Sequence, residues 1–241
     1  MLIKDLIVED SYFHFYQPIV NIEHNKIIGY EGLMRSEVHT NPEQIFLQAK
    51  KEQQLVELDS RSIQKAAKAY QKAGYRMQDG CLFLNVFPTT LLDSNFLIFV
   101  KKIMIDDPQH CQHLVFEISE LEDIQNQSRL IERIKVLKEL GFRFAIDDVG
   151  KGYSDFQTII EMEPDYIKVD RYFSQQLSQF PKKQSFIQLV NEYSKRNGCQ
   201  LILEGLETVE DLEMARQLGV EFGQGYLLGR PEPLVQLSWG T

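Results

Sequence analysis

The sequence predicts an α/β barrel of the (β/α)₈ type, and two observations favour that fold class. Short apolar runs rich in β-forming residues alternate along the chain with segments that have helical spacing. Strands that alternate with helices are typical of a mostly parallel sheet. Roughly eight such units fall within 241 residues, which fits a closed barrel better than an open, doubly wound sheet.

The candidate strands are short runs in which Val, Ile, Phe and Tyr recur, the residues that favour extended backbone. The first run differs from the others because Pro18 removes a ladder hydrogen bond, which predicts an edge strand or an otherwise atypical one. The runs are 13–20, 27–31, 81–86, 114–120, 142–148, 166–170, 200–207 and 222–228.

Three segments between these runs are expected to be helical. Each begins beside a residue that can cap a helix N-terminus, and each ends at a glycine, which favours the turn that terminates helices. With their caps and glycines, they are 42–73 (Asn41, then Pro42 at the first helical position, and Gly74), 121–140 (a capping-box sequence at 119–122, and Gly141) and 209–218 (Thr208 and Gly219).

Composition places the chain among globular proteins. Apolar residues make up 43% and charged residues 25%, which excludes a disordered chain and provides a large core. Lys and Arg number 26 against 35 Asp and Glu, so the net charge is −9. An acidic surface argues against binding to duplex nucleic acid, but not against a small anionic ligand held by cations.

The sequence also indicates a cytoplasmic protein without membrane insertion. No run of about 18 apolar residues could cross a membrane, and the charged first ten residues leave no apolar segment for a signal peptide. The three cysteines are far apart and odd in number, which argues against a disulfide framework or a zinc site. We expect buried, unreactive thiols.

Most of the apolar runs carry a polar residue at or near their C-terminal end. In a barrel these ends meet on one face, where barrel enzymes have their active sites. Carboxylates converging there would repel one another unless cations intervened, and oxygen ligands favour Mg²⁺ or Mn²⁺ over zinc. Adjacent carboxylates suggest two ions with a bridging ligand, which suits in-line displacement at phosphorus. The residues are Glu31, Asn85, Glu117, Asp147 with Asp148, Lys168, Glu204 and Gln224.

Taken singly, each of these residues has a simpler interpretation. A strand-end Asp or Glu is more often a helix N-cap or a solvated loop residue than a metal ligand. The pair Asp147 and Asp148 could form an Asx turn before Gly150, and Lys168 could be a surface lysine. Only the recurrence of polar residues at the same end of the strands favours a metal-dependent barrel enzyme.

Eight short motifs follow one another along the chain, namely YEGLMR (30–35), LNV (84–86), EISE (117–120), DDVGKGYS (147–154), IKVD (167–170), EGLE (204–207), QGY (224–226) and RPEP (230–233). Any one of them is weak evidence, whereas eight in order are specific. These eight motifs and their order resemble those of the EAL-domain phosphodiesterases, and the resemblance covers about residues 13–233.

The resemblance implies a modified (β/α)₈ barrel whose first strand runs antiparallel to its neighbours. It implies a hydrolase of bacterial signalling that converts cyclic di-GMP to linear pGpG with two Mg²⁺ or Mn²⁺ ions per site. Family members usually form homodimers. We expect residues 1–241 to be a single EAL domain, so that any sensory input would come from a separate protein or from dimerisation.

The resemblance also assigns ligands and catalytic residues. The metals would lower the pKa of a shared water, so that hydroxide attacks phosphorus while the opposite ester oxygen leaves. Lys168 would orient that water or stabilise developing charge, and Glu204 could be a ligand or the general base. The assigned residues are Glu31, Asn85, Glu117 and Asp147 for the first ion, Asp147, Asp148 and Glu204 for the second, and Glu31, Lys168 and Glu204 in catalysis.

Further positions match the family's nucleotide site and its supports. A guanidinium fork suits a phosphate oxygen, and outer carboxylates often orient the loops that carry metal ligands. The substrate-binding set is Gln17, Arg35, Gln224 and Pro231, and the loop-fixing set is Glu120, Asp170 and Glu207.

The chain departs from the family pattern mainly in the loop after Asp148. Val149 replaces a phenylalanine, Lys151 a small residue and Asp155 a serine, in a loop that in the family supports the second metal and couples the site to the dimer interface. Gly32 replaces an alanine, and the glycine adds no bulk but loosens the backbone. The main alternative function is a non-catalytic EAL domain that acts as a cyclic di-GMP receptor or a protein-interaction module, but such members usually lose several metal ligands.

Two weaker signals have simpler explanations. The sequence His110-Cys111-x-His113 resembles a metal cluster, but it lies in a polar segment, so we expect a surface loop. The basic residues of 182–196 predict a solvated helix face.

Overall fold

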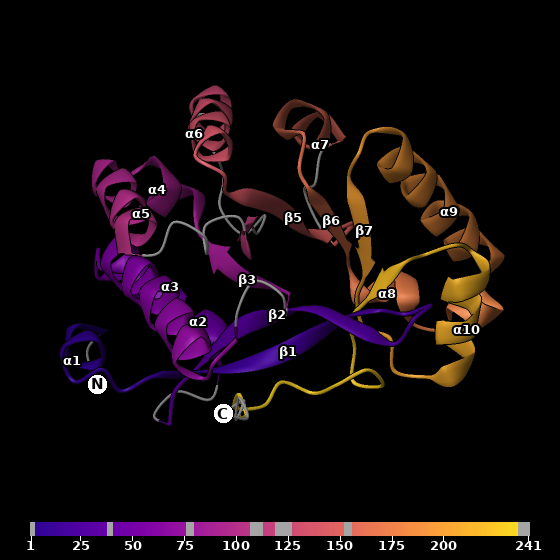
Figure 1. The fold of residues 1–241 in the computed structure, drawn as a ribbon, viewed down its shortest axis with the longest axis horizontal. Helices are drawn as coiled ribbons and strands as arrows, with labels where there is room; N and C mark the ends of the chain where they lie inside the picture. The colour runs from indigo at the N-terminus through magenta and orange to yellow at the C-terminus, as the bar shows by residue number, and fades with distance from the viewer. Residues whose placement is uncertain are drawn as a thin grey trace.

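The computed structural model describes residues 3–37, 41–75, 80–106, 113–118, 127–151 and 156–235. Eight strands close into a barrel in chain order, with helices around the outside of the strands (Figure 1). Neighbouring strands from β2 to β8 are parallel, whereas β1 is antiparallel to both β2 and β8. The predicted barrel with an antiparallel first strand is confirmed. The strands are β1 Phe13–Asn21, β2 Lys26–Arg35, β3 Cys81–Val86, β4 Leu114–Ile118, β5 Arg143–Val149, β6 Tyr166–Val169, β7 Gln200–Leu203 and β8 Phe222–Gly223.

The helices begin and end largely where the cap signals predict. The side chain of Asn41 accepts a hydrogen bond from Glu43 N, and that of Thr208 accepts one from Asp211 N. No helix in the described ranges is long and apolar enough to cross a membrane. The helices are α1 Ile3–Val8, α2 Pro42–Lys51, α3 Leu55–Lys72, α4 Pro88–Leu92, α5 Ser94–Asp106, α6 Gln127–Glu139, α7 Phe156–Met162, α8 Arg171–Ser174, α9 Pro181–Arg196 and α10 Val209–Gln217, with a 3₁₀ turn η3 at Leu177–Gln179.

Three predicted segments differ from the observed elements. The segment 42–73 is two helices rather than one, because Gln53 adopts a left-handed φ of 57° between α2 and α3. The last two strands are shorter than predicted. Gly205 turns the chain away after β7 with a φ of 71°, and a Cβ on Gly225 would lie 2.2 Å from Leu206 O, so the backbones cross closely there. The capping-box sequence at 119–122 lies outside the described residues.

Pro18 is accommodated by the antiparallel orientation of β1. Strand β8 pairs with β1 only at Val20 and Asn21, and on the same side the C-terminal segment pairs with Tyr16 through Glu232. Pro18 lies between these contacts, so its missing N–H leaves no ladder bond unmade. The strand is therefore not an edge strand, and its atypical feature is its direction. Figure 1 shows the C-terminal segment running beside β1.

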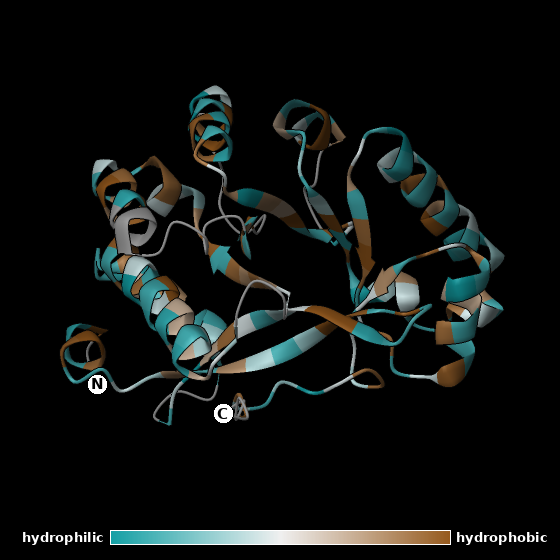
Figure 2. Ribbon diagram, viewed as in Figure 1, coloured by the Kyte–Doolittle hydropathy of each residue, from teal (hydrophilic) through white to brown (hydrophobic). Residues whose placement is uncertain are grey.

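The core has two layers, because alternate residues of each strand face opposite sides. One cluster packs the outer strand faces against the helices, and it includes Leu82, Leu84 and Phe116. A separate cluster fills the barrel interior. Its members are Ile19, Cys81, Phe83, Val115, Ala145, Tyr166, Ile202 and Phe222. Figure 2 shows brown and teal residues interspersed on both the strands and the helices.

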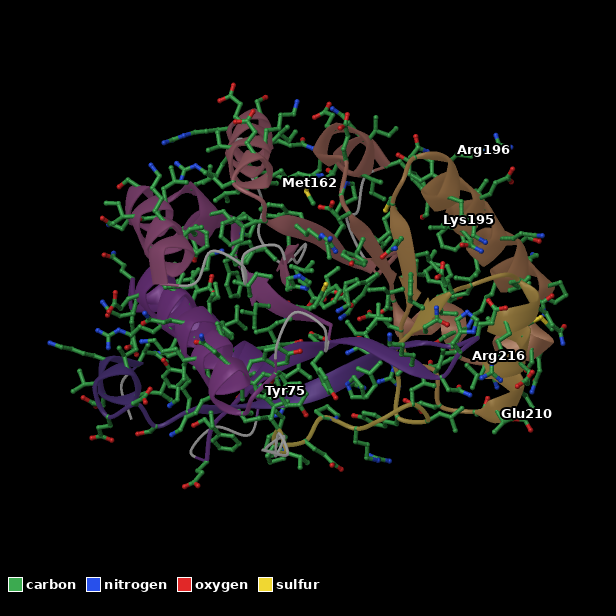
Figure 3. All side chains as sticks on the ribbon, viewed as in Figure 1. Tyr75, Met162, Lys195, Arg196, Glu210 and Arg216 are labelled. Atoms are coloured by element: carbon green, nitrogen blue, oxygen red, sulfur yellow. The ribbon has the colours of Figure 1, made fainter. Side chains whose placement is uncertain are left out.

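Two further sequence predictions, a solvated face on α9 and buried thiols, agree with the described residues. Lys195 and Arg196 lie on α9 outside the barrel (Figure 3), and both are exposed, as predicted for a solvated face. Cys81 and Cys199 are buried free thiols, and burial raises the pKa of Cys199 to about 11, which keeps it protonated. Cys111 and His110 lie outside the described residues.

One buried group gives a pH dependence that can be tested. His14 shares a hydrogen bond with Ser62 Oγ at 2.9 Å, and burial lowers the pKa of His14 to about 4. Between pH 6.5 and 4 the unfolded chain therefore binds a proton that the folded protein does not, so stability falls as pH decreases. From pH 7 to 5 this effect costs about 2 kcal/mol. In urea unfolding, His14→Gln should lose correspondingly less stability than the wild type over this range. An equal loss in both proteins would contradict the prediction.

Candidate metal centre

Polar side chains form a layer inside the barrel, next to the apolar interior. On most strands the polar residue lies two positions beyond an interior residue, which puts both on one face. On β1 the order is reversed, because that strand runs the other way. The pairs, interior residue first, are Ile19 and Gln17, Gly29 and Glu31, Phe83 and Asn85, Val115 and Glu117, Ala145 and Asp147, Tyr166 and Lys168, Ile202 and Glu204, and Phe222 and Gln224.

Lys168 lies at the centre of this layer. Its side chain is 0% exposed, so the interpretation as a surface lysine is wrong. The ammonium Nζ lies 2.9 Å from Glu117 Oε1, 2.9 Å from Glu204 Oε1, 3.1 Å from Asp147 Oδ1 and 3.4 Å from Glu31 Oε2. One cation therefore holds four carboxylates from four different strands or strand ends.

The carboxylates fall into two groups that share one member. Glu31, Glu117 and Asp147 each offer an oxygen within 4.8 Å of the others, and so do Asp147, Asp148 and Glu204. These groups match the two ligand sets that the family resemblance implies, apart from the amide of Asn85. Two cations bridged by Asp147 would fit this arrangement.

A β-bulge brings both aspartates to the same site. In a regular strand, Asp147 and Asp148 would point to opposite faces. The β5–β6 register shifts between Ile146 and Val149, so β5 has one extra residue there. Asp148 takes a left-handed φ of 56°, which is typical of the irregular backbone that bulges place beside active sites. The alternative of an Asx turn does not account for this pairing.

Amide groups orient the carboxylate of Glu31. Asn85 Nδ2 donates to Glu31 Oε1 at 3.1 Å and to Glu117 Oε2 at 3.4 Å. Gln224 Nε2 donates to Glu31 Oε2 at 2.7 Å and to Gln17 Oε1 at 3.3 Å. Gln17 in turn donates to Gly229 O at 3.1 Å. Strands at both ends of the sequence are thus joined through one carboxylate.

Burial strongly perturbs the pKa values of this layer. Burial raises the pKa of Glu204 to about 8, although Lys168 opposes the shift. Burial, and then the charge of Glu31, raise the pKa of Glu117 well above its usual value. Burial would also raise the pKa of Glu31, but Lys168 and the amides of Gln224 and Asn85 together lower it. For Lys168, the four carboxylates outweigh burial and raise the pKa well above that of a free lysine.

The donor set fits hard divalent cations. Five carboxylates face two ammonium groups, those of Lys168 and Lys151, which leaves a net formal charge of −3. Glu117 Oε1 and Asp147 Oδ1 are buried and have no hydrogen-bond donor in the described structure beyond their ion pairs with Lys168. Oxygen-only donors with excess negative charge are those that Mg²⁺ or Mn²⁺ prefers.

Gly32 packs closely beside Glu31. A Cβ on Gly32 would lie 2.8 Å from Leu84 Cδ2, so the leucine side chain occupies the space that an alanine would need. Packing between β2 and β3 therefore favours a glycine at this position.

Of the proposed substrate-binding residues, Gln17 and Gln224 belong to this layer, whereas Arg35 and Pro231 do not. Arg35 ends β2, where its Nη1 donates to Met34 O at 2.8 Å and its guanidinium lies 5.8 Å from the ring centre of Phe15. Pro231 precedes Glu232, which pairs with β1. These residues approach the barrel from elements at opposite ends of the chain.

The predicted loop-fixing residues have different contacts. Asp170 caps α8 by accepting from Tyr172 N at 2.8 Å, and its own N–H donates to Val149 O. It therefore joins the end of β6 to the end of β5. Glu207 is exposed and pairs with Arg171 at 3.7 Å. Glu120 lies outside the described residues.

A cavity of about 420 Å³ adjoins Glu31 and Asp148. Its wall includes Phe46 of α2 and Phe87 after β3, whose rings pack 5.1 Å apart. Neither residue can be identified from the sequence, because an apolar side chain gives the same pattern whether it lines a cavity or fills the core.

Removing the central ammonium should destabilise the metal-free protein. Lys168→Met leaves buried carboxylates without their cation, which should cost about 3–5 kcal/mol of unfolding free energy in EDTA. Saturating Mn²⁺ should then stabilise the variant more than the wild type, because no ammonium competes for the carboxylates. Urea unfolding with and without Mn²⁺ measures both effects, with the exposed Lys182→Met as the control. Equal stability of Lys168→Met and wild type in EDTA would contradict the account.

Comparison with known proteins places the chain among relatives of the same architecture. It is 28% identical over 240 residues to the cyclic di-GMP phosphodiesterase PdeB of Shewanella oneidensis, covering 97% of this chain and 28% of the relative. The chain thus spans under a third of that relative's length. The EAL enzyme Bd1971, solved with cAMP and cyclic di-GMP, superposes with a TM-score of 0.87 at 24% identity, over 96% of this chain and 65% of that one.

A second solved structure shares the fold. BlrP1 of Klebsiella pneumoniae, in complex with manganese and cyclic di-GMP, superposes with a TM-score of 0.83 at 24% identity, over 92% of this chain and 56% of that one. The family model of the EAL domain matches residues 3–231. With the barrel, its antiparallel first strand and this match over nearly the whole chain, the protein belongs to the EAL domain family.

Proposed function

We propose that this chain is a metal-dependent phosphodiesterase that hydrolyses cyclic di-GMP to linear pGpG. One observation carries the proposal, namely the two carboxylate groups that share Asp147 inside the barrel. Such a pair of groups suits two cations that hold the attacking and leaving oxygens of a phosphodiester. PdeB is named a cyclic di-GMP phosphodiesterase, and both Bd1971 and BlrP1 were solved with bound cyclic di-GMP, BlrP1 together with manganese.

The roles follow from the geometry. Bound Mg²⁺ or Mn²⁺ would supply Lewis-acid activation of water and neutralise charge on the phosphate. Lys168 keeps the carboxylates converged and can stabilise negative charge that develops during displacement. Glu204 either completes the second ion's ligands or accepts a proton from the attacking water. The proposed ligands are Glu31, Asn85, Glu117 and Asp147 for one ion, and Asp147, Asp148 and Glu204 for the other.

The surroundings suit a cyclic dinucleotide. Arg35 can pair with the phosphate that is not being cleaved. The cavity lined by Phe46 and Phe87 offers an aromatic wall for a base. We assign Gln17, Gln224 and Pro231 to nucleotide binding, and Asp170 and Glu207 to the support of the loops.

The receptor alternative is less favoured. All six proposed ligands are present, and the structure brings them together. A receptor that binds without turnover would not need the shared Asp147 geometry. We further propose that residues 1–241 act as one EAL domain and that the protein forms homodimers.

Glu31→Ala should abolish product formation. The variant loses one proposed ligand of the first ion and the acceptor of two amide donors, so we expect turnover to fall more than about a hundredfold. Chromatography of cyclic di-GMP incubated with Mn²⁺ would follow pGpG. The exposed Lys182→Met should retain wild-type turnover. Full turnover by Glu31→Ala would overturn the assignment, and binding of the wild type without product would favour the receptor.

Lys168→Ala tests the catalytic role of the ammonium. With saturating Mn²⁺, kcat should fall about a hundredfold or more because developing charge loses its partner, whereas KM should change much less. Steady-state kinetics separates the two constants. A large rise in KM at normal kcat would instead assign Lys168 to substrate binding.

A further inference from the structure

A second lysine reaches the carboxylates from outside the barrel. Lys151 Nζ lies 3.0 Å from Asp148 Oδ2, and it donates a hydrogen bond to that oxygen. The side chain of Lys151 is 56% exposed, and that of Asp148 is 25% exposed. Unlike Lys168, this ammonium contacts the proposed centre at its solvent side.

The backbone that carries Asp148 is held in place. Gly150 has a φ of 96°, and a Cβ there would lie 2.3 Å from the ring of Phe173. Phe173 stacks on Phe186 with ring centres 4.3 Å apart. The bulge of β5 and the N–H of Asp170 on Val149 O fix the same loop from the other side. Of the two partners, the exposed lysine side chain is therefore the one that can move.

The net charge of the site favours either Lys151 or a second divalent cation beside Asp148, but not both. The five carboxylates and two lysines carry a net formal charge of −3, so one divalent ion leaves −1 and a second would leave +1. Withdrawal of Lys151 would return that final charge to zero. Like charges a few ångströms apart repel, and an exposed ion pair is weak enough to be broken.

We propose that Lys151 is a tethered competitor for the second divalent cation. Its ammonium neutralises Asp148 until that ion binds, and it thereby weakens the second site without affecting the first. Lys151 acts through Asp148 and is a positioning residue rather than a catalytic one. The inference rests on the proposed two-ion centre, and it makes occupancy of the second site depend on cation concentration.

A Mn²⁺ titration followed by the electron paramagnetic resonance signal of free Mn²⁺ tests this role. Lys151→Met should bind the second ion about fivefold more tightly than the wild type, as loss of one exposed ion pair allows, with unchanged affinity for the first ion. Lys151→Arg keeps the charge and should restore the weaker second site. Lys182→Met removes the same charge from an exposed position on α9 and should match the wild type.

The outcomes separate this inference from the proposed function. If the wild type and Lys151→Met both bind two Mn²⁺ ions and have equal affinity for the second ion, the role of Lys151 is overturned. The proposed metal centre is not affected by that result. If Lys182→Met raises the affinity for the second ion as much as Lys151→Met does, the effect comes from total charge, and the role of Lys151 is again overturned. A wild type that binds no Mn²⁺, or an Asp147→Asn variant that still binds both ions, would overturn the metal centre and the competitor role together. Unfolding midpoints in EDTA confirm that each variant is folded.

Discussion

The buried ammonium of Lys168 is the interaction on which the site depends. Four carboxylates from separate strands lie within 3.4 Å of its Nζ, in a setting where unpaired charges would be very costly. In the metal-free protein, Lys168 offsets part of the electrostatic cost of bringing these carboxylates together, but it neutralises only part of their charge. The remaining negative charge suits the divalent cations that we propose, so the same arrangement offsets the burial of the carboxylates and leaves donors for metal ions.

The barrel achieves this by dividing its interior into two layers. Phe83, Val115 and Ile202 are in the apolar layer, and on these strands the polar residue two positions further along lies in the next layer. Eight strands of different sequence contribute to one site because their registers are held by the ladder. The apolar layer closes one side of the site to water, which strengthens the electrostatic interactions above it.

Much of this organisation could be predicted, since it depends on local patterns. The alternation of strand and helix identifies the barrel, and caps such as Asn41 and Thr208 mark helix ends because their hydrogen bonds span only a few residues. The polar residues at strand ends could be recognised for the same reason. The break at Gln53 could not, because a glutamine takes the left-handed position that a glycine usually marks at a helix end. The early ends of β7 and β8 could not either, because close backbone crossings arise from packing between distant segments.

The order of the strands, the carboxylates, the amides and the two lysines are all apparent in the amino-acid sequence. Their arrangement in space is not. The bulge that turns Asp147 and Asp148 to one face, the burial of Lys168 among four carboxylates and the pairing of Lys151 with Asp148 all depend on neighbouring strands and loops. Charge interactions depend on distance and burial, and both are set by chain segments far apart in the sequence.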